Sequence, residues 1–312
     1  MTAATGQPHT VVTAAGELDL GALDAAVDAA VAAGAPGALR ILGYGEITLV
    51  LGWPTERPAF AVKRLPILRD TAQLERYETL LTAYVAELGR RGVSVVATDV
   101  RATAGPRPHA YLVQPLVPPE RMLNRLLRSV EAERGAALLA QVATAVAETV
   151  DGRVGLDAQV ANWAVDGDRV SCVDVSTPLM RGDDGRDLLD LSLFLSIYPW
   201  ALRPVLARIA HHVIGQFHDP RSVLVDVASN LVKERLGRWL PALLAAANAH
   251  VAPSIGEREV RAYFARDKRL WLLMQRLRRA DRAWQRRVRH RPYPFLLPPP
   301  YRYGPAEIPE SP

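Results

Sequence analysis

The stretch GLDAQVANWAVDGDRVSCVDVS, residues 155–176, says most about how this chain folds. It opens with a loop in which Asp157 and Asn162 stand five residues apart, and two short apolar segments then flank a turn at 166–168, which predicts a tight hairpin. Asp174 directly follows the second segment. Carboxylate and amide oxygens are hard ligands that suit Mg²⁺, so Asn162 and Asp174 are candidate metal ligands. The alternative is a turn capped by its own Asp and Asn side chains.

Two upstream features suggest phosphate binding. Gly43-Tyr44-Gly45-Glu46 lies at a predicted turn between strands, where Gly43 and Gly45 would let backbone N–H groups approach a phosphate. A G-x-G turn also marks any tight hairpin. Lys63 lies near the end of an apolar strand and is one of only three lysines among 38 basic residues. An ammonium fits between phosphate oxygens better than a guanidinium does, although Lys63 could equally be a surface lysine.

A carboxylate on the next helix, predicted over 71–91, would be the natural partner of Lys63. Glu75 and Glu78 stand three residues apart there and therefore on one side of the helix. We favour Glu78 because it is closer to the helix end, and Glu75 stays an alternative. Either glutamate could instead be a solvated surface charge.

Hydrophobic spacing predicts the other elements. A further helix is expected over 18–33, and strands are expected within 38–51, 60–65, 93–101 and 109–113. Beyond residue 120 the pattern is helical apart from the hairpin strands 163–165 and 170–173. The predicted parts are an arm and helix (1–36), a sheet-containing lobe (37–116), a helical lobe (117–291) and a Pro- and Tyr-rich tail (292–312).

The composition is typical of a globular protein without a membrane span. The chain has 312 residues, of which 49% are hydrophobic and 23% charged. One cysteine excludes an intrachain disulfide, and no secretory signal or long apolar segment is visible, so we expect a cytoplasmic protein. Between Glu257 and Arg291, 13 Lys and Arg residues face 4 Asp and Glu residues, so the net charge of +5 reflects one basic segment. Nucleic acid is therefore not an expected partner.

The order of these features resembles that of protein-kinase-like phosphotransferases, most closely the aminoglycoside phosphotransferase and choline kinase branch and bacterial members of that fold. The resemblance covers about residues 38–180. It implies an α+β, protein-kinase-like two-lobe fold: a small antiparallel five-strand N-lobe with one helix, and a mostly helical C-lobe. It also implies an ATP- and Mg²⁺-dependent kinase that phosphorylates a hydroxyl group of a small-molecule acceptor.

The resemblance assigns a role to each candidate residue. Gly43 and Gly45 would cover the nucleotide phosphates, and Lys63 would bind the α- and β-phosphates and pair with Glu78. The linker from Gln114 to Val117 would contact adenine. Asp157 would orient the acceptor hydroxyl or act as its base, Gln159 would lie near the transferred phosphate, and Asn162 and Asp174 would hold Mg²⁺.

Three departures from the family pattern point to an alternative function. Thr48 stands near the position of the third loop glycine, and Gly155-Leu156 replaces the His or Arg before the catalytic Asp. Gln159 is neutral where the family has Lys or His, which removes charge stabilisation of the transferred phosphate. The alternative is a weak or inactive pseudokinase that binds nucleotide or a partner. The basic helix predicted over 258–289 packs on the domain or makes weak peripheral contact with a membrane.

Overall fold

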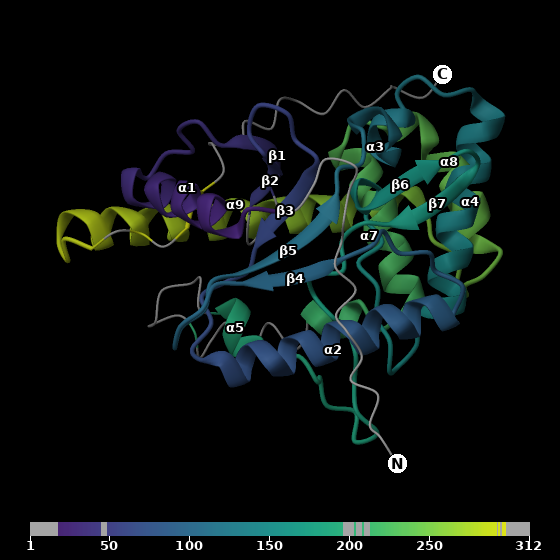
Figure 1. The fold of residues 1–312 in the computed structure, drawn as a ribbon. Helices are drawn as coiled ribbons and strands as arrows, with labels where there is room; N and C mark the ends of the chain where they lie inside the picture. The colour runs from purple at the N-terminus through teal and green to yellow at the C-terminus, as the bar shows by residue number, and fades with distance from the viewer. Residues whose placement is uncertain are drawn as a thin grey trace, which may run out of the picture. The chain divides into compact units, whose positions relative to one another are not determined.

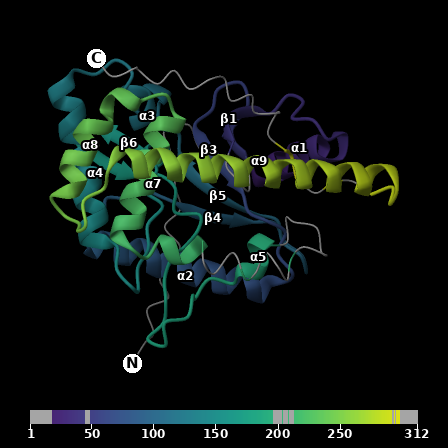
Figure 2. The ribbon, with the colours of Figure 1, turned by 180° about the vertical axis from the view of Figure 1, so that it is seen from behind.

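The computed structural model describes residues 18–44, 49–195, 203, 208, 213–291, 293 and 295–297 and is drawn in Figure 1 and Figure 2. The chain divides into two compact units. Unit 1 consists of Met1–Leu74, Val96–Leu116 and Pro292–Leu296, and unit 2 of Glu75–Val95, Val117–Arg291 and Leu297–Pro312. The elements confirm the α+β class. Among the described helices, none is long and apolar enough to cross a membrane.

Unit 1 contains a five-stranded antiparallel sheet in the order β1-β2-β3-β5-β4. Its strands are β1 (Arg40–Tyr44), β2 (Leu49–Trp53), β3 (Phe60–Arg64), β4 (Asp99–Ala102) and β5 (Ala110–Pro115). The five predicted strands are therefore confirmed, with one correction. The strand expected over 93–101 starts only at Asp99, because Val95 instead forms an isolated bridge with Cys172.

Helix α1 (Leu20–Ala33) covers one face of this sheet. Asp19 caps its start by accepting a hydrogen bond from the backbone N–H of Ala22 at 2.9 Å. Gly34 ends it at φ 71°, in the left-handed region that glycine adopts without strain. Leu23 and Val27 pack into a core that holds the inward side chains of β2, β3 and β5: Leu49, Leu51, Phe60, Val62, Tyr111 and Val113.

The strand period of two places Lys63 on the opposite face of the sheet. Phe60 and Val62 face α1, so Ala61 and Lys63 point the other way. In the register of the sheet, Lys63 lies opposite Leu112 on β5 and opposite Val50 on β2. Lys63 therefore lies on the face of the sheet away from α1.

Unit 2 holds most of α2 (Thr71–Arg90) together with the helices and hairpin that follow the linker. The longer helices are α4 (Ala132–Thr149), α7 (Pro220–Lys233), α8 (Leu240–Asn248) and α9 (Glu257–Arg287), and the shorter ones are α3 (Leu123–Leu126), α5 (Leu191–Leu195), η1 (Pro119–Arg121), η2 (Val160–Asn162) and η4 (Gly237–Trp239). The predicted hairpin is confirmed as β6 (Trp163–Asp166) and β7 (Arg169–Cys172). Gly167 provides the positive φ of its turn, at 57°.

Tight packing within unit 2 positions the loop before this hairpin. Helix α4 packs against α7 and α8, and α7 packs against α9, as Figure 2 shows from behind. The ring of Trp239 lies directly against the backbone of α4 at Gly135, and its indole N–H donates to the carbonyl of Leu127 at 2.7 Å. α7 supplies Asn230, which reaches the loop.

Candidate functional site

From Leu156 to Val160, in the candidate catalytic loop (residues 155–159) and at the start of η2, buried and partly exposed side chains alternate. Leu156, Ala158 and Val160 are buried, with exposed fractions of 0%, 1% and 0%. Asp157 and Gln159, which lie between them, are only partly buried. Burial of the three apolar side chains thus leaves the Asp157 side chain between them partly exposed.

Neighbouring elements hold the start of this loop by its backbone. The Tyr84 hydroxyl of α2 donates to the Gly155 carbonyl at 2.8 Å, and the Gly155 N–H donates to the Leu179 carbonyl at 2.8 Å. A Cβ at position 155 would lie 2.8 Å from the Phe217 carbonyl and 2.9 Å from His218 Nδ1. There is no room for a side chain there, which explains why the chain has glycine at this position.

Asp157, Asn162 and Asp174 are brought together at the base of the hairpin. The Asn162 side-chain amide donates a hydrogen bond to the backbone carbonyl of Asp157 at 3.2 Å. The Val173 N–H, next to Asp174, donates to the Asn162 carbonyl at 2.8 Å. These two hydrogen bonds join the loop to the segment after the hairpin.

Local hydrogen bonds orient both carboxylates. Asp174 Oδ1 accepts from the Ser176 N–H at 3.0 Å and from the Ser176 hydroxyl at 2.7 Å, while the Ser176 carbonyl accepts from the Tyr77 hydroxyl at 2.9 Å. Asp157 Oδ1 accepts a longer bond of 3.4 Å from the Gln159 N–H. The Ser176 contacts thus hold the Asp174 side chain in one direction.

Asp157 and Asp174 both act on the pKa of two buried side chains, Cys172 and Tyr84. Burial raises the pKa of the Cys172 thiol, and the negative charges of Asp174 and Asp157 raise it further. Burial raises the pKa of Tyr84 as well, with smaller contributions from Cys172 and from the same two carboxylates. The thiol and the phenol therefore stay neutral at pH 7, and Asp157 and Asp174 set a negative potential that suits a divalent cation.

Asn230 of α7 clamps the middle of the loop, a role that local sequence patterns do not reveal. Its side-chain oxygen accepts from the Val160 N–H at 3.0 Å, and its amide nitrogen donates to Gln159 Oε1 at 3.2 Å. Asn230 is only 3% exposed. The Gln159 side chain is thus held toward α7.

Asn230→Ala is expected to lower the free energy of unfolding by about 2–3 kcal/mol, because it leaves the buried Val160 N–H without its acceptor. Chemical denaturation would measure this. Asn248→Ala is the matched control, since Asn248 also makes two hydrogen bonds, to Ile255, away from the loop. We expect both variants to lose stability, but only Asn230→Ala to weaken the binding of nucleotide. An Asn230→Ala protein as stable as the wild type would contradict the clamp.

His218 lies behind the loop as a buried neutral side chain. Its side chain is 1% exposed, and among the described residues neither ring nitrogen has a hydrogen-bond partner. Asp187 Oδ1 lies 3.9 Å from Nε2, and Arg181 binds that same carboxylate at 2.9 Å. Burial and the nearby Arg181 lower the pKa of His218, while Asp187 and Asp151 partly oppose this.

This lowered pKa predicts acid sensitivity. The unfolded chain binds a proton near pH 6.5, whereas folded His218 does so only at lower pH, so unfolding becomes easier as the pH falls below 6.5. The contribution is at most about 1.4 kcal/mol per pH unit. In urea titrations, we expect the free energy of unfolding of His218→Phe to match that of the wild type at pH 8. Between pH 6.5 and 5.5 it should fall less than that of the wild type. Parallel pH profiles would rule out this role for His218.

Unit 1 holds the predicted phosphate-binding residues Lys63 and Gly43 and, from the predicted adenine-contacting linker, Gln114. Lys63 and Gln114 lie on neighbouring strands β3 and β5, and Gln114 Nε2 donates to the Thr98 hydroxyl at 2.8 Å. Gly43 lies in β1 beside a register shift, and a Cβ there would meet no atom within 4 Å. Gly45 and Thr48 lie outside the described residues.

The remaining predicted residues belong to unit 2. Glu78 on α2 is partly buried, and Glu75 is exposed. Val117 follows β5 and is partly exposed. The pairing of Lys63 with Glu78 stays a prediction.

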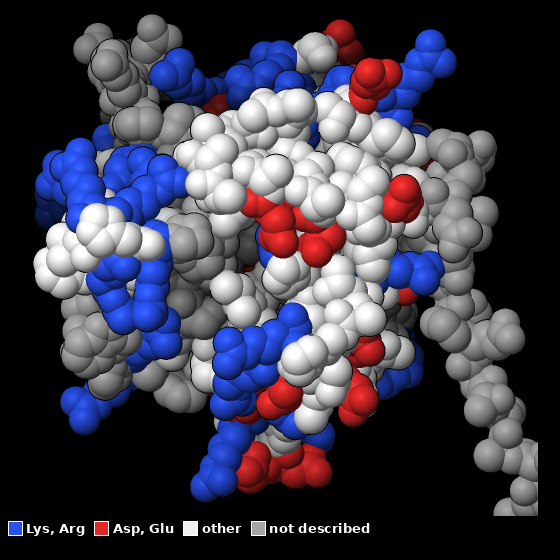
Figure 3. All heavy atoms as spheres, turned by 60° about the vertical axis from the view of Figure 1, so that its left-hand side comes forward, with Lys and Arg blue, Asp and Glu red and all other residues white. Residues whose placement is uncertain are grey.

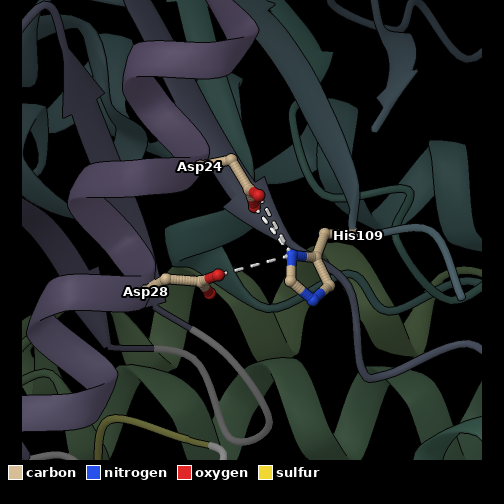
Figure 4. A group of neighbouring side chains, drawn as sticks. All are labelled: Asp24, Asp28 and His109. Atoms are coloured by element: carbon tan, nitrogen blue, oxygen red, sulfur yellow. Dashed lines mark hydrogen bonds and ion pairs between the residues drawn. The ribbon is translucent and has the colours of Figure 1, made fainter. Parts of the chain in front are cut away.

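A second polar cluster, absent from the sequence-based prediction, lies between α1 and the sheet of unit 1. Figure 4 shows Asp24 and Asp28 of α1 directed at the ring of His109. His109 Nδ1 lies 2.9 Å and 3.1 Å from the two Asp24 oxygens and 3.9 Å from Asp28 Oδ2. The four-residue spacing of the two aspartates was the only signal in the sequence.

The spacing of these three donors suits a metal ion, but the cluster already has its own cation. Arg64 donates to Asp28 at 2.8 Å, and the Tyr111 hydroxyl donates to Asp24 at 2.5 Å. Burial and, in smaller part, the bond to Asp24 raise the pKa of Tyr111, while Arg64 opposes them. A guanidinium and a phenol thus occupy carboxylate oxygens that a metal would need, so we interpret the cluster as a polar clamp that fixes α1 to the sheet.

Comparison with known proteins places the chain in a family without assigning an activity. A search of curated proteins finds no match to the sequence. A family profile matches residues 22–282, a span that runs from α1 through the sheet, the catalytic-loop candidate and the hairpin into α9. The chain belongs to the family that this profile describes, the family of unknown function DUF6206.

Proposed function

We propose that this protein is an ATP- and Mg²⁺-dependent phosphotransferase that acts on a hydroxyl group of a small molecule. The observation that carries the proposal is the assembly of Asp157, Asn162 and Asp174 through the hydrogen bonds at the hairpin base. Their order, and the placement of Lys63 on the third strand of an antiparallel sheet, support a protein-kinase-like two-lobe fold of the aminoglycoside phosphotransferase and choline kinase type.

The donor set fits a magnesium ion. Asp174 offers a carboxylate oriented by Ser176, and Asn162 offers an amide oxygen, since its amide nitrogen is committed to the Asp157 carbonyl. Both are hard oxygen donors of the type that Mg²⁺ binds together with phosphate oxygens. When bound, Mg²⁺ would neutralise negative charge on the nucleotide phosphates.

Each residue then has a distinct task. Asp157 orients the acceptor hydroxyl and accepts its proton, which requires an ionised, partly exposed carboxylate. Lys63 contacts the α- and β-phosphates as a compact charge, with Gly43 and Gly45 above them, and Glu78 orients Lys63. Gln114 and Val117 contact the adenine. With one cysteine, which is buried and unpaired, we place this reaction in the cytoplasm.

The loop also explains one departure from the family pattern. The resemblance implies a His or Arg before the catalytic Asp, and this chain has Gly155-Leu156 there. A side chain at 155 would come too close to the Phe217 carbonyl and to His218 Nδ1, so the packing behind the loop requires glycine.

The second candidate is a pseudokinase that binds nucleotide without efficient transfer. It is favoured by Gln159, which is neutral and whose side-chain oxygen accepts a hydrogen bond from Asn230. A side chain held in this way supplies no positive charge to a transferred phosphate. Under this candidate the metal ligands are retained for binding.

A turnover screen distinguishes the two candidates. The purified protein would be incubated with Mg·ATP and pools of sugars, aminocyclitols and amino alcohols, and ADP release would be compared with that of acceptor-free samples. The phosphotransferase should release ADP faster with at least one pool. Binding of Mg·ATP with no acceptor-dependent ADP would favour the pseudokinase, and absence of both binding and turnover would contradict both candidates.

A further inference from the structure

Helix α9, the basic helix of unit 2, has an unusual distribution of polarity. On its buried side lie Gln275 and Arg278, which are 4% and 2% exposed. On its exposed side lie Leu270, Leu273, Trp284 and, just beyond its end, Val288, with exposed fractions of 43%, 52%, 54% and 53%. A surface helix normally buries its apolar residues, so this helix needs another explanation for its exposed face.

The exposed apolar residues share one side of the helix, in a stripe made of two pairs separated by about 16 Å. At 3.6 residues per turn, Leu270, Leu273, Trp284 and Val288 point within about 60° of one another. They are four of the seven large hydrophobic side chains that are exposed in the described part of the chain. Such a concentration on one helix marks an interaction surface more often than chance exposure does.

Arginines line the edge of the same stripe. Arg269, Arg276 and Arg287 are exposed and point within about 20° of one another, next to the apolar residues. From Arg266 to Arg291 there are 11 Lys and Arg residues and only two acidic ones, Asp267 and Asp281. Burial and the nearby charge of Arg282 lower the pKa of Arg279, as expected where cations crowd together. Figure 3 shows Lys and Arg side chains gathered beside uncharged ones on the face drawn.

We propose that the exposed face of α9 docks the protein on a membrane surface rich in anionic phospholipids. Arginines would contact the phosphate groups, and the leucines and valine would enter the boundary between headgroups and acyl chains. Trp284 fits this depth, because indole rings favour the membrane–water interface. Nucleic acid would engage the same arginines but would offer no apolar environment to Leu270, Leu273 and Val288, so lipid explains more of the surface.

Co-sedimentation of the full chain with vesicles tests this proposal. Vesicles of phosphatidylcholine with about 30% phosphatidylglycerol should bind several times more protein than pure phosphatidylcholine, and the bound fraction should fall in 0.5 M NaCl. Equal binding to both vesicle types, or no binding to either, would overturn the proposal. Tighter binding to a DNA or RNA oligonucleotide than to anionic vesicles would overturn it in favour of nucleic acid.

Two pairs of variants separate the stripe from general surface effects. The first is a triple variant that combines Arg269→Gln, Arg276→Gln and Arg287→Gln. It should lower the partition coefficient between water and anionic vesicles at least about tenfold. The same change at three exposed arginines elsewhere, Arg107, Arg128 and Arg186, should change it far less.

The apolar residues are tested in the same way. Leu273→Gln with Trp284→Gln should weaken binding even in low salt, whereas Ile67→Gln with Leu188→Gln, at other exposed positions, should not. Circular dichroism would verify that all variants fold. Loss of binding in the control variants to the same extent as in the α9 variants would contradict a site on α9.

Discussion

Asp157→Asn is expected to lower acceptor-dependent ATP turnover by about 10²–10⁴-fold, the usual contribution of a general base, with Mg·ATP affinity nearly unchanged. Asparagine keeps the size of the side chain and the oxygen that accepts from the Gln159 N–H, so the loop should stay in place. It loses the negative charge that attracts the proton of the acceptor hydroxyl. The effect should therefore appear in kcat and not in nucleotide binding.

Asp166→Asn provides the control for this variant. Asp166 is the last residue of β6, beside the turn of the same hairpin; its side chain is 83% exposed, and it pairs with Arg121 at the surface. Its replacement removes one negative charge close to the site without touching the loop. A turnover loss of similar size in both variants, or an active Asp157→Asn enzyme, would refute the assigned role of Asp157.

Gly135→Ala should produce the largest loss of stability, about 2–3 kcal/mol or more, as measured by chemical denaturation. A Cβ at this position would lie 2.1 Å from one ring carbon of Trp239 and 2.5 Å from another. The indole is rigid, 5% exposed and tied to the Leu127 carbonyl, so it has little room to move. The usual gain from replacing a helical glycine with alanine, about 0.5–1 kcal/mol, is therefore reversed.

Gly89→Ala in α2 is the matched substitution, since a Cβ there would meet no atom within 4 Å. It should leave stability equal or slightly raised. Combining Gly135→Ala with Trp239→Leu replaces the indole by a smaller side chain and should recover part of the lost stability. This recovery would appear as a coupling energy in a double-mutant cycle. If Gly135→Ala were as stable as Gly89→Ala, the packing of Trp239 on α4 would have to be revised.

Local patterns predict the elements of this chain well because each pattern reports on its own segment. The hairpin follows from Asp166-Gly167-Asp168 between apolar runs, and the long helices follow from three- and four-residue spacings. The strand predicted over 93–101 failed at its start, because Val95 is drawn into a bridge with Cys172, far away in the sequence. A single sequence does not show such a tertiary contact.

The same limit applies to the candidate site. Asp157, Asn162 and Asp174 could be recognised because they lie within one short segment. Asn230 and His218, which support that segment, come from more than 40 residues further along the chain and have no local signature. The polar clamp of Asp24, Asp28 and His109 depends on α1 meeting β5, which spacing along one helix does not reveal.

The most direct test of the phosphotransferase proposal is isothermal titration calorimetry of the full chain with ATP and Mg²⁺. The wild type should give saturable heat that is lost when EDTA removes Mg²⁺. Asp174→Asn, which keeps an oxygen for Ser176 and loses only the charge, should bind Mg·ATP at least about tenfold more weakly. Absence of binding by the wild type, or equal affinity in both proteins with and without Mg²⁺, would contradict the magnesium–nucleotide site at Asn162 and Asp174.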